Sequence, residues 1–429
     1  MAGDEVRWIE RRDGVRQRYH LARRPESDVS LWAPDAHAGI AYEERRLPPL
    51  DNPDAYPRQY VQDRKAPYLA AVVPPIADAS FTLDPEVLAA ADDATSAIVR
   101  FDAEHTQFPA PFAAVLLRSE SASSSQIEQL TAGARAIAEA AIGERSEGNG
   151  PIVASNVRAM EAAVALADGL DDATIIAMHR VLLDDHAPKL TGQYRQEQVW
   201  IGGRLPQDAA FVPPHHERVP AAMADFLAFT ERTDLPVLAH TAIAHAQFET
   251  IHPFSDGNGR TGRAIVQSML RRGRLIRHMT IPVSAGLLGD LQRYHGALDA
   301  FHSGDPNPIV AEFSQAALAG LTNARQLATD LQALQSTWTE RLAGLRADAA
   351  ARRLAVATMS QPVLNLRVAT DALGVSQPAA SNALDQLVER GILSPGNSKR
   401  RNRIWINQEV IATLDAFAAR STRRQGRYT

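Results

Sequence analysis

The sequence predicts a mainly α-helical protein, with a helical body that carries one small β-hairpin and a C-terminal helix–turn–helix–hairpin unit. Three observations lead to this prediction. Apolar residues recur at helical spacing through the middle of the chain, a Val-Trp-Ile-Gly-Gly stretch interrupts them at 199–203, and a pattern of shorter elements begins after residue 360. The chain has 429 residues, 45% hydrophobic and 22% charged, which suits about two or three globular domains.

An N-terminal arm and a helical domain come first in the chain. Residues 1–66 are polar, rich in proline and without a sustained helical period, so we expect an extended arm. A helical domain is expected over 67–335, and its first helix should follow Asp84, which can cap it, with Pro85 at the first position. Further helices are predicted at Ser124–Ala141, Asn156–Ala167, Asp172–Leu183, Val219–Glu231, Pro236–Ile251 and Arg260–Arg271. The glycines after Val199-Trp200-Ile201 predict a hairpin within 194–212.

The C-terminal part begins with an apolar stripe on a long helix. Its members are spaced by three or four residues: Leu327, Leu331, Leu334, Trp338, Leu342 and Leu345. We expect this stripe to pack against the neighbouring domain rather than form a coiled coil, with 336–355 as a helical linker. The pattern of 356–429 resembles a winged helix-turn-helix domain with a basic tail, in which 376–390 would be the second helix and 398–406 the wing.

The wing of that unit is basic and suggests a partner. Lys399, Arg400, Arg401 and Arg403 could contact DNA phosphates in a salt-dependent way. Asp385 and Glu389 on the second helix favour a solvated hairpin instead, and contact with a protein partner is an equal alternative.

Composition excludes several classes of protein and site. The chain has no cysteine, which removes disulfides, thiolate nucleophiles and cysteine zinc sites. It has no apolar stretch of membrane-spanning length and no secretion signal, so we expect a cytoplasmic protein with no membrane partner. A formal net charge of -5 gives no global reason to bind nucleic acid.

The stretch 244–263, AHAQFETIHPFSDGNGRTGR, has the pattern of an anion-binding site. A helix ends near Pro253, a glycine loop follows, and free amides at the start of the next helix can bind a phosphate, with Gly257 and Gly259 allowing close approach. Arg260 and Arg263 are three residues apart and can reach one polyphosphate. Asp256 is the acid suited to hold Mg²⁺, and a neutral His252 could take a proton from an incoming hydroxyl.

Other sites fit this stretch less well. A P-loop needs a lysine that is missing here, and a calcium loop from Asp256 would place Arg260 where an oxygen ligand is required. His245, Glu249 and His252 share a helix face and could bind zinc, although no further ligand is evident.

The sequence resembles the Fic family, whose signature HPFxDGNGRxxR is matched by His252–Arg263. Members with this signature generally transfer AMP from ATP to a hydroxyl side chain of a target protein and release pyrophosphate. The resemblance implies that His252 is the general base, that Asp256 holds Mg²⁺, and that five residues bind the phosphates: Gly257, Asn258, Gly259, Arg260 and Arg263. It also implies that the hairpin near 199–203 is a flap that pairs with the target segment.

Many Fic proteins carry an inhibitory helix with the pattern [ST]xxxE[GN]. Ser124 and Glu128 match it, but Gln129 stands where Gly or Asn is expected. A Glu128 carboxylate held against Arg263 would occupy the place of the γ-phosphate. The segment 143–148 offers Glu147 as a second candidate, but it starts with Gly143, and the glycines and proline up to 151 predict a loop.

We therefore expect a protein adenylyltransferase that acts on a Ser, Thr or Tyr hydroxyl and is inhibited by Glu128 against Arg263, with ATP as co-substrate and Mg²⁺ as cofactor. A DNA-binding regulator that senses nucleotide is the alternative from another class. A Fic enzyme that uses another nucleotide donor, or that removes the modification, is a third. The target protein is unknown, and a homodimer is left open.

Overall fold

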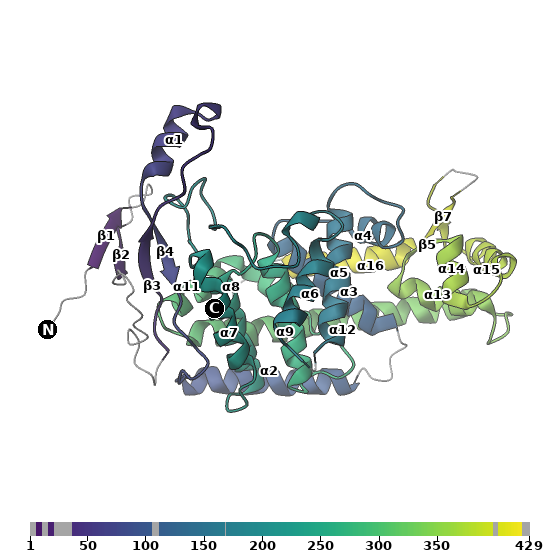
Figure 1. Cartoon of the computed structure of the whole chain (residues 1–429). Helices are drawn as coiled ribbons and strands as arrows, with labels where there is room; N and C mark the ends of the chain where they lie inside the picture. The colour runs from purple at the N-terminus through teal and green to yellow at the C-terminus, as the bar shows by residue number, and fades with distance from the viewer. Residues whose placement is uncertain are drawn as a thin grey trace.

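The computed structural model describes residues 6–10, 16–20, 37–104, 111–167, 169–397 and 402–422. Helices dominate, as predicted, and Figure 1 shows an elongated molecule with two small sheets at one end and the C-terminal unit at the other. The helices of the body are α2 (Pro85–Glu104), α3 (Pro111–Ile127), α4 (Ala134–Ala141), α5 (Asn149–Ala165), α6 (Asp172–Leu183), α7 (Val219–Thr230), α8 (Val237–Ile251), α9 (Asn258–Arg272), α10 (Val283–Leu287), α11 (Leu291–His302) and α12 (Asn307–Arg341).

Helix α8 is the central element of the body. It is buried on every side, and it packs against α9 and α12. The predicted range of α6 is confirmed at both ends, and its start follows from Asp171, whose side chain accepts a hydrogen bond from Thr174 N at 2.7 Å. Helix α9 begins two residues before the predicted Arg260, so the whole GNGR segment borders its first turn.

The single helix predicted over 124–141 is wrong. Helix α3 ends at Ile127, the backbone reverses at Gln129 with a φ of 63°, and α4 starts at Ala134. The turn is closed because Leu130 N donates to Ser125 O at 3.0 Å. Glu128 therefore stands in the turn that ends α3 rather than inside a helix.

The loop predicted up to residue 151 is shorter than expected. Helix α5 starts at Asn149, so Pro151 lies in its first turn. A proline is tolerated there because the N–H that it lacks would have no partner within the helix.

The N-terminal residues are not purely extended, which corrects the prediction for 1–66. A hairpin pairs β1 (Val6–Glu10) with β2 (Arg16–His20), and η2 (Pro53–Ala55) and α1 (Arg58–Lys65) follow. Strand β3 (Ala41–Arg45) pairs antiparallel with β4 (Tyr68–Val72), which lies in the predicted helical domain. Glu43 of β3 also accepts hydrogen bonds from Arg218 at 3.1 and 2.8 Å, so this segment is joined to the body.

The predicted hairpin near 199–203 is reduced to one antiparallel bridge between Ile201 and Phe211. The positive φ values of Gly202 and Gly203, 71° and 70°, turn the chain after that bridge. The short 3-10 turns η3 (Pro188–Leu190) and η4 (His216–Arg218) lie on either side of this segment.

The C-terminal unit contains the predicted order of helix, turn, helix and hairpin, and it has further elements before and after them. Its elements are α13 (Ala350–Ser360), β5 (Val363–Asn365), α14 (Leu366–Leu373), α15 (Gln377–Glu389), β6 (Ser394–Pro395), β7 (Ile404–Ile406) and α16 (Gln408–Thr422), with strand order β5-β7-β6. The expected linker from 336 begins inside α12, which runs unbroken to Arg341. Lys399, Arg400 and Arg401 of the predicted wing lie outside the described residues.

Helix α16 returns from the C-terminal unit to the body and packs against α12, α3 and α4 (Figure 1). Four residues of the apolar stripe are buried within this chain: Leu327, Leu331, Trp338 and Leu342. This confirms the prediction that the stripe packs against the rest of the protein rather than forming a coiled coil. One continuous hydrophobic core extends from α2 to α16. Within the described ranges, no helix is both long and apolar enough to cross a membrane.

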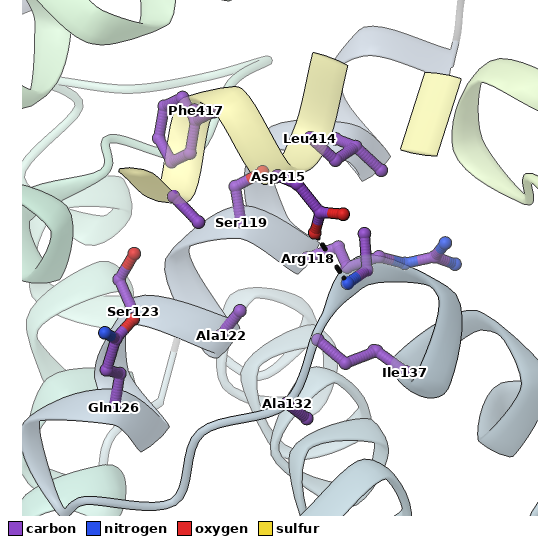
Figure 2. A pocket seen from close by; sticks show the side chains of 12 residues that line it. Arg118, Ser119, Ala122, Ser123, Gln126, Ala132, Ile137, Leu414, Asp415 and Phe417 are labelled. Atoms are coloured by element: carbon purple, nitrogen blue, oxygen red, sulfur yellow. Dashed lines mark hydrogen bonds between the residues drawn. The ribbon is translucent and has the colours of Figure 1, made fainter. Parts of the chain in front are cut away.

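A pocket lies between α3, α4 and α16 (Figure 2). Ser119, Ala122, Ser123 and Gln126 line it from α3, and Asp415 lines it from α16. The Asp415 carboxylate accepts a hydrogen bond from Ala134 N, the first residue of α4, at 3.0 Å. The C-terminal helix thus holds the far end of the turn that contains Glu128.

Candidate active site

The loop between α8 and α9 is held by its own side chains. Asn258 Oδ1 accepts from Phe254 N and Asn258 Nδ2 donates to Phe254 O, both at 2.8 Å. Gly257 has a φ of 77°, and a Cβ there would lie 3.0 Å from Leu182. The Asn258 side chain is thereby committed to shaping the loop, which leaves its backbone N–H, at the start of α9, as the group that could bind phosphate.

His252 ends α8 in the left-handed region, with φ 50° and ψ 61°. Its Nδ1 lies 3.3 Å from Glu249 O, and because a carbonyl only accepts, this contact favours the tautomer with the proton on Nδ1. Burial lowers the pKa of His252 to about 4, which outweighs the contact with Glu249 O. The ring is therefore neutral near pH 7, and Nε2 is left as a proton acceptor.

Arg195 fixes the backbone on which His252 is carried. Its Nε donates to His252 O at 2.8 Å, and its backbone N donates to Pro253 O at 2.9 Å. Sequence reasoning missed this residue, since nothing near Arg195 in the sequence indicates contact with a segment 57 positions away.

Asp256 lies at the mouth of the loop, with a side chain that is 53% exposed. Its Oδ1 accepts from Gly257 N at 2.6 Å and from Arg260 Nη2 at 3.2 Å. One exposed carboxylate beside a phosphate-binding loop fits Mg²⁺, which proteins usually hold through one or two carboxylates together with substrate phosphates.

Arg260 is buried and has donors in excess of its partners. Only 3% of the residue is exposed, yet Nε and Nη1 have no hydrogen-bond partner within the part of the chain that the structure describes. Buried polar groups are nearly always satisfied. Two unsatisfied guanidinium donors beside a helix N-terminus therefore indicate a place for an anion.

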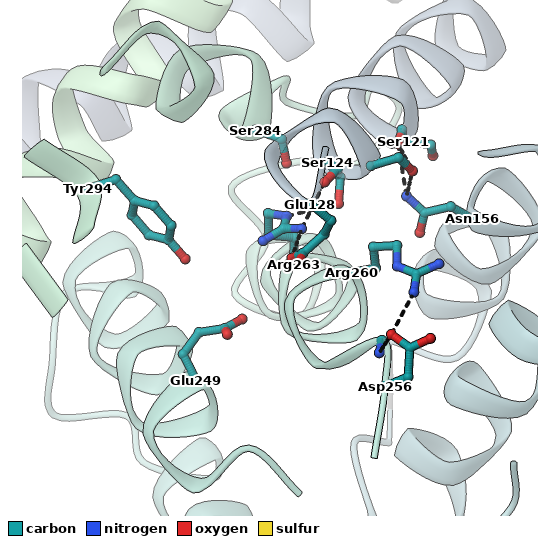
Figure 3. A network of polar contacts seen from close by, with 12 residues as sticks. Ser121, Ser124, Glu128, Asn156, Glu249, Asp256, Arg260, Arg263, Ser284 and Tyr294 are labelled. Atoms are coloured by element: carbon teal, nitrogen blue, oxygen red, sulfur yellow. Dashed lines mark hydrogen bonds and ion pairs between the residues drawn. The ribbon is translucent and has the colours of Figure 1, made fainter. Parts of the chain in front are cut away.

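Arg263 is bound by the two residues of the predicted inhibitory pattern (Figure 3). Its Nε donates to Ser124 Oγ at 2.9 Å, and its Nη2 donates to Ser124 O and to Glu128 Oε1, both at 2.8 Å. Burial raises the pKa of Glu128, but the charges of Arg263 and Arg260 outweigh it, so the net shift is downward and the carboxyl is ionised.

Gly259 permits the Glu128 carboxylate to lie on the first turn of α9. A Cβ at this position would stand 1.9 Å from Glu128 Oε1 and 2.8 Å from Arg263 Nη1. A carboxylate thus occupies the anion-binding end of α9 in this structure.

A buried polar layer lies beside these residues and was not predicted as part of the site. His179 stacks on Phe254 with ring centroids 3.7 Å apart, and its Nε2 lies 3.0 Å from Asp256 O. Burial raises the pKa of Glu249 to about 7, against the opposing charge of Arg263, and its Oε1 has no hydrogen-bond partner among the described residues. Figure 3 shows Glu249 and Tyr294 on the side of Arg263 away from Asp256.

The structure brings the predicted site residues together around the start of α9. The residues contributed by the signature are His252, Asp256, Gly257, Asn258, Gly259, Arg260 and Arg263, and the turn that follows α3 contributes Glu128. Glu147, the second inhibitory candidate, is exposed in the loop before α5. The zinc alternative gains no support, since His245 Nε2 is bonded to the Tyr294 hydroxyl at 2.7 Å.

Comparison with known proteins gives similarities in both sequence and structure. A sequence model of the Fic/DOC family matches residues 169–270. A protein adenylyltransferase Fic from Nematostella vectensis is 30% identical over 141 residues, which are 33% of this chain and 30% of that protein. Protein adenylyltransferase fic-1 from Caenorhabditis elegans is 27% identical over 164 residues, 38% of this chain and 30% of that protein. The chain thus matches about a third of the length of these relatives.

A crystal structure of a Fic family protein from Desulfovibrio desulfuricans G20 aligns with a TM-score of 0.48 at 24% identity, over 76% of this chain and 97% of that chain. The segment from residue 169 to residue 270, which matches the Fic/DOC family model, holds His252 and both arginines of the site.

Proposed function

We propose that this protein transfers AMP from ATP to a Ser, Thr or Tyr hydroxyl of a target protein, and that Glu128 inhibits the transfer. The observation that carries the proposal is the Glu128 carboxylate, which lies against Arg263 and over Gly259, where an anion would bind to α9. The unsatisfied donors of Arg260 beside it support the same conclusion.

Each residue of the site has a role in this reaction. His252 Nε2 takes the proton of the target hydroxyl, whose oxygen forms a bond to the α-phosphorus while the bond from that phosphorus to the pyrophosphate oxygen breaks. Arg260, Arg263 and the first amides of α9 bind the charge of the leaving pyrophosphate. Asp256 would hold Mg²⁺, which supplies charge neutralisation to the phosphates when bound. Arg195 keeps His252 at the end of α8.

Glu128 opposes the reaction by charge and by occupancy. While its carboxylate is hydrogen-bonded to Arg263, that guanidinium is not available to a γ-phosphate, and two anions would repel each other at the same helix end. ATP would then bind with its phosphates displaced. Removal of the carboxylate should release the inhibition without changing the catalytic groups.

Labelled ATP tests the reaction. The wild type, Glu128→Gly and His252→Ala are incubated with Mg²⁺ and ATP labelled at the α or the γ phosphate, and label on protein is measured. We expect strong α-label with Glu128→Gly, weak α-label with the wild type and none with His252→Ala. A γ-label would indicate kinase chemistry instead, and competition by UTP would indicate another donor.

A second activity, DNA binding by the C-terminal unit, is favoured by the polar start of α15. Gln377 is exposed at the first position of α15 and Asn382 in the first half of the helix, and amide side chains near the start of such a helix can read base edges. Arg403, which stacks on the ring of Trp405, adds a positive charge beside β7. Binding to duplex DNA that weakens steeply with salt and is lost in Gln377→Ala/Asn382→Ala would support this activity. If that variant binds duplex DNA as tightly as the wild type does, α15 does not read the DNA bases.

A further inference from the structure

A cluster of metal-ligating side chains lies outside the candidate active site, at the start of η4. His215, His216 and Glu217 are consecutive in the sequence, and each offers one ligand atom within 4.8 Å of the others. Two prolines precede them, and α7 follows at Val219. The proposed adenylyl transfer uses none of the three.

The geometry of this cluster is close to that of a metal site. His215 Nδ1 lies 3.2 Å from Glu217 Oε2. Ligands at about 2.0–2.1 Å from a tetrahedral zinc stand roughly 3.3–3.4 Å apart, so this pair already has the required spacing. The rings of His215 and His216 have centroids 4.1 Å apart, which places the third ligand beside the first two.

One nitrogen of each imidazole in the cluster lacks a hydrogen-bond partner. Nδ1 of His215 and Nδ1 of His216 are both shielded from solvent, and neither has a hydrogen-bond partner in the described ranges of the chain. Buried nitrogens without a partner are uncommon in folded proteins.

We propose that His215, His216 and Glu217 form a zinc site with three protein ligands. Two imidazoles and one carboxylate are a ligand set that zinc accepts, with water in the fourth position. Magnesium would be a poor occupant, because it prefers oxygen ligands.

The site lies where the N-terminal sheet meets the body. Arg45 Nη1 of β3 is 3.6 Å from Glu217 Oε2, and Glu43 of the same strand binds Arg218. On the other side, Arg195 Nη2 donates to Pro214 O, and its Nε donates to His252 O. Zinc bound here would therefore tie η4 in place between β3 and the segment that Arg195 connects to His252.

Arg45 gives the proposal a distinctive test, because it competes with a cation for Glu217. The positive charge of Arg45 is partly balanced by Glu43, whose Oε1 lies 3.0 Å from Arg45 Nη2. Replacing Arg45 by Gln removes a positive charge beside the site, so zinc affinity should rise by about 3- to 10-fold. A cluster that only packs the sheet against the body would show no such gain.

Zinc binding is measured on the full chain after treatment with a chelator, by calorimetry or by competition with a zinc indicator, in excess Mg²⁺. We expect one equivalent of zinc in the wild type. Affinity should fall at least about 10-fold in His215→Ala and His216→Ala, since even outer-shell changes cost that much. His216→Gln keeps the size of the side chain and tests the same ligand, with circular dichroism as the check on folding.

Two further variants locate the site. His278→Ala removes an exposed histidine elsewhere, and Asp256→Ala removes the acid of the active site; both should bind zinc as the wild type does. Wild-type affinity in folded His215→Ala and His216→Gln, or the absence of zinc binding by the wild type, would overturn the proposal. This readout does not depend on adenylyl transfer, so the two proposals fail separately.

Discussion

Gln129 occupies a backbone conformation that a residue with a Cβ disfavours, and this makes the strength of the proposed inhibition by Glu128 adjustable. Its φ of 63° lies in the left-handed region, and it directly follows Glu128 in the turn that ends α3. The inhibitory pattern of related sequences has Gly or Asn at this position, the residues that adopt this region most readily. We expect Gln129→Gly to hold Glu128 more firmly against Arg263.

The magnitude follows from two opposing contributions. The left-handed conformation costs a residue with a Cβ about 1–2 kcal/mol, whereas glycine loses about 0.5–1 kcal/mol more conformational entropy when it is fixed. The net gain is roughly 0.5–1 kcal/mol, which corresponds to roughly 2- to 5-fold tighter seating. The Gln129 side chain is exposed, so its removal should cost little else.

The assay is the basal rate of α-label transfer, with urea unfolding measured in parallel. Gln129→Gly should lower the basal rate by roughly 2- to 5-fold and raise the free energy of unfolding slightly. Gln129→Ala is the matched control, because it removes the side chain but keeps the Cβ, and it should behave as the wild type does. A faster basal rate in Gln129→Gly, or an equal change in Gln129→Ala, would refute the backbone argument.

Three other predictions concern the site. Because the pKa of His252 is lowered to about 4, transfer by Glu128→Gly should be flat from about pH 6 to 8 and should fall only below about pH 5, when the ring gains a proton; a midpoint near pH 6.5 in the rate profile would contradict the assignment. Glu249 has its pKa raised to about 7 from 4.5, so the folded state loses stability as pH rises through this window, on the order of 3 kcal/mol in all. The free energy of unfolding in urea, measured at pH 4 and at pH 8, should fall less between these pH values in Glu249→Gln than in the wild type. An equal fall in both proteins would exclude Glu249 as the cause. Gly259→Ala places a Cβ on the Glu128 carboxylate but also in the phosphate site, so it should show no gain in α-label transfer, whereas activation to the level of Glu128→Gly would mean that phosphates bind elsewhere.

Local signals in the sequence predicted the helical body and the residues around His252. Helix α6 has its own capping residue in Asp171, and the loop between α8 and α9 is closed within five residues by Asn258. These elements could be predicted because the interactions that define them join neighbours in the sequence.

The features that sequence reasoning missed depend on distant contacts. The turn at Gln129 interrupts an alanine-rich stretch that looks helical, and no local signal marks it. The contact of Glu128 with Arg263, 135 residues away, was expected only because the family resemblance implied it. Strands β3 and β4 are five residues each, and their pairing across α1 has no local signal. Arg195 likewise reaches His252 only after the chain has folded.

The central claim is that the Glu128 carboxylate occupies the place that the end of a triphosphate needs. Crystals of the wild type and of Glu128→Gly, each grown with Mg²⁺ and a non-hydrolysable ATP analogue, test it directly by the position of the γ-phosphate. We predict that in Glu128→Gly this phosphate lies within hydrogen-bond distance of Arg263 and of the first amides of α9, and that in the wild type it is displaced or unbound. A γ-phosphate in the same place in both, with the wild-type pair of Glu128 and Arg263 intact, would contradict the account.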